Sequence, residues 1–407
     1  MSDAPPGGLW RNRDFNLLWV SQSLSSLGSS ISSLAVPLLV LALTGSPVRA
    51  GLVGTIGLVA ALLTRLPAGV LVDRVDRRRA MLVCDTISLL TYAGLGLAVL
   101  DGRATLGLVI AATVLGTVAG SVFSTAEHSA LRNLVPAGQL PAAVVRNEAR
   151  SYATSLAGPP VGGLLFGLGR ALPFLADALT FVLSLIGVLL IRKPMQEVRE
   201  PQKASSALAE GIRFVLGNPF LRATLVIAAV LNFAITGILF TIIVTLQRHG
   251  TSPAIIGTVE TVVSVGGLLG AFAAPALQRR LRLPVLIRGI CWAAAVLMLL
   301  SAPLTATVAA AVPVALAVFM GPAVNAALFG HQAAITPDRL QGRVVSVIFL
   351  VATSVQAVAP LLAGVLIATW GSPTAIVVLA LSVAGAALAA TLSRGIRTMQ
   401  PAPELAG

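Results

Sequence analysis

Long apolar runs alternate with short polar segments along most of the chain. A helix needs about 20 mostly apolar residues to cross a bilayer whose hydrocarbon core is about 30 Å thick. The pattern therefore predicts an all-α integral membrane protein with 12 transmembrane helices. The predicted spans are residues 16–43, 48–72, 79–100, 105–126, 144–168, 171–192, 221–247, 254–278, 283–302, 304–330, 343–370 and 372–393.

Landmark residues of the first half of the chain recur in the second half at two fixed separations. Pairs 201 residues apart are Gly69 and Gly270, Arg78 and Arg279, Pro136 and Pro337, Pro159 and Pro360, and Gly163 and Gly364. Pairs 206 residues apart are Asn12 and Asn218, Pro47 and Pro253, and Gly51 and Gly257. We therefore predict two six-helix pseudo-repeats, residues 1–192 and 219–395, with a polar linker at 193–218 and a tail at 396–407. The linker ends in SALAEGIRFVL, which is typical of an amphipathic surface helix.

Composition supports a membrane protein, and topology accounts for the high positive charge. Of 407 residues, 56% are hydrophobic and 11% are charged, and the mean hydropathy is +0.92. The net charge is +13, and 23 of the 28 Lys and Arg residues fall in alternate predicted loops and near the two ends. The positive-inside rule places both termini in the cytoplasm. We expect the protein to lie in the inner or plasma membrane. We therefore expect no nucleic-acid partner.

The segment GVLVDRVDRRR, residues 69–79, places six charges between two predicted spans. It resembles the loop between helices 2 and 3 of the major facilitator superfamily of transporters. The positions that match are Gly69, Asp73, Arg74, Arg77 and Arg78, while Asp76 stands where the family usually has Gly. The resemblance implies a conformational latch on the cytoplasmic side, with Asp73 facing the start of helix 11 near residues 341–343. Gly69 is expected to allow close helix approach, and the arginines to bind carboxylates or helix C-termini of the other half.

Predicted helix 5 contains SLAGPPVGG, which is similar to an element of the superfamily's antiporters at Gly158, Pro159, Gly162 and Gly163. Close helix packing and an export function both account for these residues. The segments RNRDFNLLWVSQSLSSLG, ALRNLVPAGQLPAAVVRNEA and TPDRLQGRVVSV resemble one branch, the macrolide-efflux and siderophore-exporter-like secretion effectors. That resemblance implies a major facilitator fold with substrate held between the halves. It also implies export of macrolides, other antibiotics, siderophores or related natural products.

A proton gradient is the expected energy source, because the sequence has no Gly-x-x-x-x-Gly-Lys-Ser/Thr phosphate loop. Ionisable residues inside spans are default functional candidates. Glu260 stands alone in its span and is suited to carrying a proton, although solvation at the outer rim also explains it. Asp85 and Asp177 are further candidates. Asp85 is level with Arg65 and could form a structural pair with it, while Asp177 could bind water or Arg170.

The predicted substrate cavity is mostly apolar with sparse polar groups. Its candidate lining residues are Gln22, Ser26, Tyr152, Asn232, Phe233, Asn325 and Gln356. So few charges favour a neutral or weakly cationic hydrophobic substrate. We expect a monomer in the lipid bilayer that handles a small hydrophobic molecule and protons, with no cofactor, metal or enzymatic site. An importer or facilitator of a small nutrient and a non-transporting scaffold or accessory subunit are the alternatives.

Overall fold

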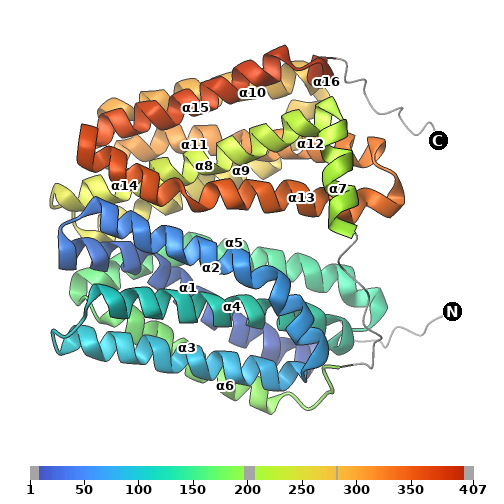
Figure 1. Ribbon diagram of the computed structural model, residues 1–407. Coiled ribbons are helices and arrows are strands. Elements are labelled where there is room, and N and C mark those ends of the chain that lie inside the picture. Colours follow the sequence, from blue (N-terminus) through green and yellow to red (C-terminus); the bar gives the residue numbers. More distant parts are fainter. Residues whose placement is uncertain (1–8, 197–206, 281–282, 398–407) are drawn as a thin grey trace. The chain divides into compact units, whose positions relative to one another are not determined.

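The computed structural model describes residues 9–196, 207–280 and 283–397, which form helices joined by short turns (Figure 1). Residues 197–206 of the predicted linker and 398–407 of the predicted tail lie outside the described residues. The α-helices are α1 (Arg13–Thr44), α2 (Pro47–Arg74), α3 (Arg77–Leu100), α4 (Leu106–Leu134), α5 (Leu140–Leu168), α6 (Leu172–Leu190), α7 (Ala207–Gly217), α8 (Pro219–Arg248), α9 (Pro253–Arg280), α10 (Leu283–Leu300), α11 (Ala311–Phe319), α12 (Gly321–Ile335), α13 (Asp338–Ala357), α14 (Ala359–Trp370), α15 (Ser372–Leu392) and α16 (Arg394–Arg397). The short 3-10 helices are η1 (Leu9–Arg11), η2 (Ala137–Gln139), η3 (Ala302–Leu304) and η4 (Val308–Ala310).

Eleven helical segments in the described part of the chain are long and apolar enough to cross a membrane. They match every predicted span except the fifth, so the all-helical membrane architecture is confirmed and the count of twelve is not. Helix α5 has 29 residues, which at 1.5 Å per residue gives about 43 Å, so it is long enough. Its first half carries Arg146, Glu148 and Arg150, and its second half carries several Gly and Pro residues. Its composition is therefore too polar to qualify as a span.

Two repeat-related asparagines begin corresponding helices. The Asn12 side chain accepts a hydrogen bond from a first-turn N–H of α1, and the Asn218 side chain accepts two from the first turn of α8. Each side chain satisfies backbone donors that the start of a helix leaves unpaired. Helix α1 ends at Thr44 and is capped by Gly45, whose φ of 66° is the left-handed conformation that glycine adopts readily. The two caps therefore start α1 and α8 at equivalent points of the predicted repeat.

The chain divides into two compact units. Unit 1 comprises residues 1–45, 56–201 and 252–261, and unit 2 comprises residues 46–55, 202–251 and 262–407. This division departs from the predicted halves at two helices. The first turns of α2 belong to unit 2, and the first turns of α9 belong to unit 1.

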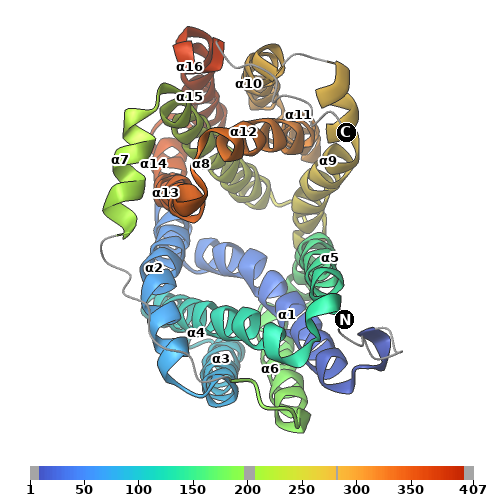
Figure 2. The ribbon, with the colours of Figure 1, turned by 90° about the vertical axis from the view of Figure 1, so that its right-hand side faces the viewer.

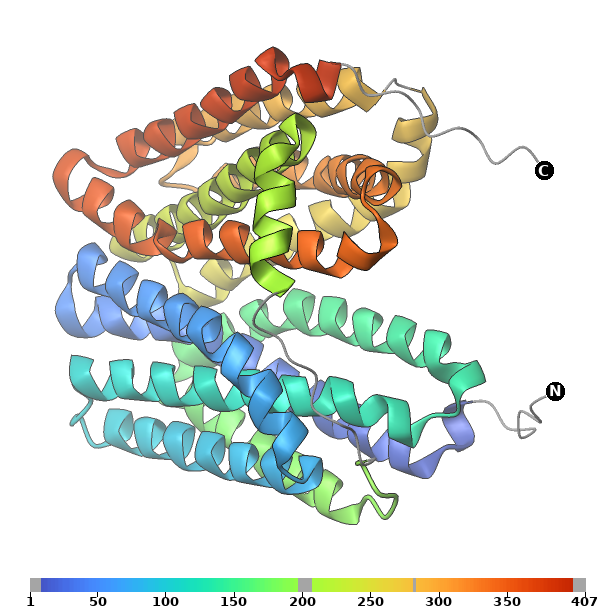
Figure 3. The ribbon, with the colours of Figure 1, turned by 45° about the vertical axis from the view of Figure 1, so that its right-hand side comes forward.

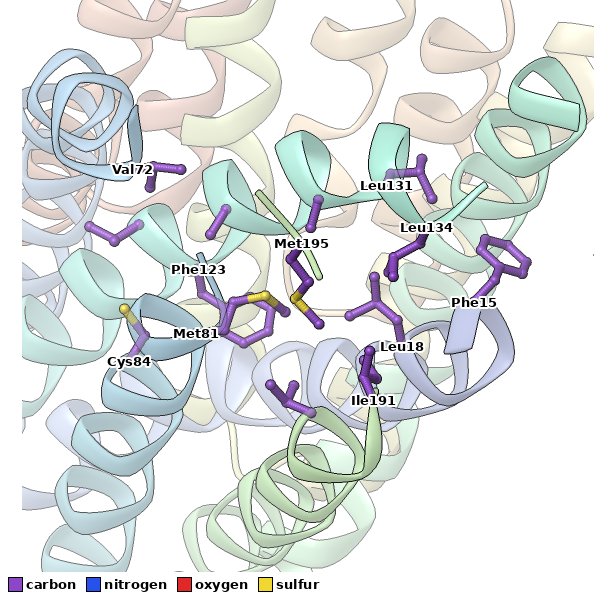
Figure 4. Packing of buried hydrophobic residues seen from close by; sticks show 14 of the residues in the cluster. Phe15, Leu18, Val72, Met81, Cys84, Phe123, Leu131, Leu134, Ile191 and Met195 are labelled. Carbon is purple, nitrogen blue, oxygen red and sulfur yellow. The ribbon is translucent and has the colours of Figure 1, made fainter. Parts of the chain in front are cut away.

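In unit 1, α1 packs against α5 and α6, and α3 packs against α4 and α6 (Figure 2). A cluster of buried apolar residues contains members from each of the α-helices α1 to α6 and from the segment that follows α6 (Figure 4). Phe15, Leu18, Met81, Leu134 and Met195 are among its members. Close packing of these side chains fixes the chain after α6 against the helices of unit 1.

In unit 2, α8 packs against α13, α14 and α15, and α10 packs against α11 and α15. The linker helix α7 packs against α13 (Figure 3). A second apolar cluster includes Val215 of α7, Phe220 and Leu221 of α8 and Val344 of α13. Helix α7 is therefore an integral part of unit 2, with one apolar face buried as its sequence pattern predicts.

Two glycines bring α5 and α9 into backbone contact within unit 1. A Cβ added to Gly163 of α5 would overlap the Pro253 carbonyl oxygen of α9. A Cβ added to Gly257 of α9 would overlap the Pro159 carbonyl oxygen of α5. Only a residue without a side chain permits this approach.

The same contacts recur between α2 and α14 within unit 2. A Cβ on Gly364 of α14 would overlap the Pro47 carbonyl oxygen, and one on Gly51 of α2 would overlap the Pro360 carbonyl oxygen. Gly364 and Pro360 lie 201 residues after Gly163 and Pro159, while Gly51 and Pro47 lie 206 residues before their counterparts in α9. The sequence repeat is therefore reproduced at the level of individual contacts.

Candidate functional site

The glycine-proline element of α5 makes contacts on two sides within unit 1. A Cβ on Gly158 would overlap the Ser30 side chain of α1, and a Cβ on Gly162 would lie 2.6 Å from the Ile31 carbonyl oxygen. Gly163 meets α9 as described above. The element thus allows α5 to pack closely against α1 and α9 at once, which accounts for its small residues.

The basic loop that follows α2 is bound by its own unit. Arg77 is buried and donates hydrogen bonds to the Ser129 carbonyl at 3.2 Å and the Met195 carbonyl at 3.0 Å. Arg78 donates a hydrogen bond to the carbonyl of Leu189, in the last turn of α6. Binding of an arginine to a helix C-terminus was predicted. The helix that is bound, however, belongs to the same half of the chain as the loop.

Other residues of this loop have separate roles. A Cβ added to Gly69 would meet no atom of the described structure within 4 Å, and the close helix approach expected of this glycine stays a prediction. Asp76 is the N-cap of α3, because its side chain accepts a 2.9 Å hydrogen bond from the Arg79 N–H. This cap gives a structural reason for an aspartate where the family usually has glycine. Asp73 and Arg74 are exposed, and the latch that they were expected to form stays a prediction.

Two carboxyl groups are buried in unit 1 beside hydroxyl groups. Asp85 of α3 accepts a 2.7 Å hydrogen bond from Ser184 of α6. Asp177 of α6 has one oxygen 3.4 Å from the Thr180 hydroxyl, and its other oxygen has no hydrogen-bond partner among the described residues. The observed partner of Asp85 is Ser184. Arg65 is exposed, and the pair expected between Arg65 and Asp85 stays a prediction.

Glu260 lies on α9, within the short stretch of that helix that belongs to unit 1. Its side chain is half-buried. The next residue, Thr261, donates a 3.1 Å hydrogen bond to the Leu156 carbonyl of α5. Glu260 therefore directly precedes a residue that binds α5, and its part in proton coupling stays a prediction.

An ion pair inside unit 1 was missed by the sequence-based prediction. Arg150 Nη1 of α5 lies 2.7 Å from Glu127 Oε1 of α4, and the two side chains are 7% and 4% exposed. The prediction ended helix 4 at residue 126 and so left Glu127 outside the span, whereas α4 continues to Leu134. The spacing of the sequence could have indicated that Glu127 is buried. Glu127 lies four residues after Phe123 and three before Ala130, and both of these are on the buried face of α4.

A second group of charges links the linker helix to unit 2. Glu210 of α7 forms ion pairs with Arg339, at 2.8 Å, and with Arg343, both in the first turns of α13. Beside Glu210, a Cβ on Gly211 would lie 3.1 Å from the Arg343 Cβ, so α7 and α13 are in close contact. Arg343, which was expected near Asp73, therefore has Glu210 as its observed partner.

The predicted cavity residues lie in different settings. Gln22 of α1 is buried, and its Nε2 has no hydrogen-bond partner among the described residues. Gln356 of α13 donates a 2.9 Å hydrogen bond to Thr236 of α8, and Asn232 donates to a carbonyl of its own helix. The remaining candidates are half-buried Ser26 and Phe233 and exposed Tyr152 and Asn325. Within the described ranges, no group of three or more His, Cys, Asp and Glu side chains could hold a metal ion.

Two units of long apolar helices, related by a sequence repeat and sharing α2 and α9, define a polytopic helical membrane protein of the transporter class. The sequence model of the Major Facilitator Superfamily matches residues 18–360. The chain belongs to this superfamily, whose members are transporters and not enzymes.

Known relatives and solved structures agree with this assignment. The "Multidrug efflux pump Tap" of Mycobacterium tuberculosis is 28% identical over 413 residues, covering 95% of each chain. The pump of the same name from Mycolicibacterium fortuitum is 28% identical, over 62% of this chain and 64% of the pump. The fold is similar to an inward-facing bacterial homologue of the lysosomal transporter Spinster, with a TM-score of 0.75, 16% identity and coverage of 98% and 100%. A bacterial homologue of the iron transporter ferroportin gives a TM-score of 0.74 at 16% identity, with coverage of 95% and 99%.

Proposed function

We propose that this chain is a proton-coupled exporter of hydrophobic or amphipathic small molecules. The observation that carries the proposal is the match to a multidrug efflux pump of Mycobacterium tuberculosis over 95% of both chains. The close contacts of the α5 element with α1 and α9 are compatible with the antiporter-like signature, although close packing alone would produce them.

A neutral or weakly cationic substrate fits the sequence, since only 11% of the residues are charged. The resemblance to macrolide and siderophore exporters suggests macrolides, other antibiotics and siderophores as the classes to test first. We propose cytoplasmic termini, because of the positive-inside distribution of Lys and Arg. A monomer in the inner or plasma membrane completes the proposal.

We assign the proton gradient as the energy source and Glu260 as the first coupling residue to test. A coupling carboxylate has to exchange its proton during transport. Asp85 is buried against Ser184, and Glu127 is paired with Arg150, so both have structural partners. Glu260 is half-buried and stands in the stretch of α9 that contacts α5, where a change of protonation would act on a helix contact.

The test measures accumulation of ethidium and erythromycin in efflux-deficient cells, with and without a protonophore. Wild type is compared with Glu260→Gln, Asp73→Asn and the matched control Asp101→Asn, an exposed acid at the end of α3. A coupled exporter lowers accumulation, and the effect disappears with the protonophore. Glu260→Gln and Asp73→Asn abolish the effect, whereas Asp101→Asn retains it.

Other results would contradict parts of the proposal. Uptake of a nutrient with no change in drug accumulation would identify an importer. Efflux that persists with the protonophore would exclude a proton gradient as the driving force. Copurifying subunits without any gradient-dependent flux would point to an accessory role.

A further inference from the structure

The ion pair of Glu127 and Arg150 joins α4 to α5 inside unit 1 by two contacts. Arg150 Nη1 lies 2.7 Å from one oxygen of Glu127, and Nη2 lies 3.4 Å from the other. Both side chains are more than nine-tenths buried. Removing two charges from water is costly, so such a pair is weak support for stability by itself.

Two buried hydrogen-bond donors, one on α1 and one on α5, have no acceptor among the described residues. Arg150 Nε is buried and without a hydrogen-bond partner among the described residues, although the other end of the guanidinium binds Glu127. Gln22 of α1 is 4% exposed, and its Nε2 also lacks a partner in the described ranges. Buried donors are nearly always satisfied, because an unsatisfied one forfeits its hydration without compensation.

The register of α1 and α5 places these two donors at the same level. Trp19 Nε1 of α1 donates a 3.3 Å hydrogen bond to the Arg146 carbonyl of α5. Further along both helices, Ser30 meets Gly158, so α1 and α5 run in the same direction. Gln22 follows Trp19 by three residues and Arg150 follows Arg146 by four, which puts each about 5 to 6 Å beyond the Trp19 contact.

We propose that Gln22 and Arg150, with Glu127 holding the guanidinium, form a polar anchor for an uncharged acceptor oxygen of the transported molecule. This inference rests on the proposed function and names the substrate chemistry of one part of it. Glu127 already balances the charge of Arg150, so an anionic group would gain little. A carbonyl, ether or hydroxyl oxygen would accept hydrogen bonds from Gln22 Nε2 and Arg150 Nε. Substrates that carry such oxygens would be preferred over hydrophobic molecules that lack them.

The test compares two probes that differ in this property. Erythromycin carries many carbonyl, ether and hydroxyl oxygens, whereas tetraphenylphosphonium is a hydrophobic cation with none. Binding of each probe to the purified full-length protein is measured at equilibrium, and gradient-driven transport is measured separately in inside-out vesicles. Gln22→Leu removes one donor at similar size and without a change of charge. Ser23→Ala is the matched control, because the Ser23 hydroxyl donates its hydrogen bond to the Trp19 carbonyl of its own helix.

The expected result is that Gln22→Leu weakens erythromycin binding about tenfold, the effect of one lost hydrogen bond. The KM for erythromycin transport rises by the same factor at unchanged maximal rate, and tetraphenylphosphonium is unaffected. Arg150→Lys, which keeps the charge and removes Nε, repeats the selective loss. Where Arg150→Lys reduces the amount of folded protein, Gln22→Leu alone decides.

Equal binding of erythromycin by wild type and Gln22→Leu, including no binding by either, overturns the anchor. A loss that is the same for both probes also overturns it, because the donors would then only shape the bundle or bind buried water. Failure of the proposed function is seen separately, as absence of gradient-driven transport by wild type.

Discussion

Arg77, the first residue of α3, donates a 3.0 Å hydrogen bond to the carbonyl oxygen of Met195, beyond the end of α6. Asn133 of α4 donates to the same carbonyl at 2.7 Å. Nearby, Asp14 of α1 accepts from the backbone N–H groups of Arg192 and Lys193. The beginning of the linker is therefore held by α1, α3 and α4 of unit 1. Arg77 was expected to serve a latch, and its observed partners give it a structural role in its own half.

Arg77→Gln should destabilise unit 1 by about 2 kcal/mol, because a buried guanidinium that binds two carbonyls is lost. The measurement is the midpoint of thermal unfolding in detergent, followed by the loss of the monodisperse peak in size-exclusion chromatography. Arg79→Gln is the control, since Arg79 is exposed and contributes its backbone N–H to the cap of α3. An equal midpoint for both variants would show that the contacts of Arg77 do not stabilise the fold.

Gly163→Ala should lower both the yield of folded protein and its efflux activity, because the new Cβ would overlap the Pro253 carbonyl oxygen of α9. We expect at least a tenfold loss of efflux per folded molecule. Gly167→Ala is a matched control one turn away, where the nearest atom to a new Cβ is the Pro253 Cδ at 3.9 Å. Normal efflux by Gly163→Ala would show that the contact between α5 and α9 is free to adjust.

The repeat extends this prediction to unit 2. Gly364→Ala should have the same effect as Gly163→Ala, because it would overlap the Pro47 carbonyl oxygen of α2. Gly385→Ala serves as its control, since no atom of the described structure lies within 4 Å of a Cβ there. Loss of efflux in one of the two glycine variants alone would mean that the two repeats contribute unequally to transport.

The sequence predicted the helices well because the apolar spans are long and the repeat offsets are fixed. The pairing of Gly163 with Gly364 by sequence became a pair of equivalent contacts in the structure. The fifth span, predicted at residues 144–168, is the exception, because Arg146, Arg150 and several Gly and Pro residues make α5 too polar to qualify as a span. Periodicity reports which face of a helix is buried, and it does not report the partner of each side chain.

The site was less predictable than the fold, because the partners of charged residues are set by packing. Arg77 was expected to belong to a cytoplasmic latch, and nothing in GVLVDRVDRRR indicates that its acceptors are main-chain carbonyls of Ser129 and Met195. Glu127 and Arg150 are 23 residues apart, across a turn, and no spacing rule links them. The sequence therefore identified charged residues in and beside the predicted spans, whereas the structure was needed to identify their partners.

Glu260→Gln and Asp85→Asn should separate a coupling carboxyl from a structural one. Asn at position 85 keeps an acceptor oxygen for Ser184, so proton-driven efflux should stay within about twofold of wild type. Gln at position 260 cannot exchange a proton, so efflux driven by an imposed pH gradient should be lost, while exchange of labelled for unlabelled substrate persists. The assay is transport in proteoliposomes with and without the gradient. Loss of gradient-driven efflux in Asp85→Asn with retention in Glu260→Gln would reverse the assignment.

Glu210→Gln should loosen the linker helix without unfolding unit 2. Glu210 binds Arg339 and Arg343 at a partly exposed position, where ion pairs contribute at most about 1 kcal/mol. We therefore expect backbone amides of α7 to exchange with deuterium about fivefold faster, with unchanged exchange in α8. Arg213→Gln, an exposed charge on the same helix, is the control. If Glu210→Gln exchanges like wild type while Val215→Ala exchanges faster, α7 is held by the apolar contacts of Val215 alone, and the ion pairs with α13 do not restrain it.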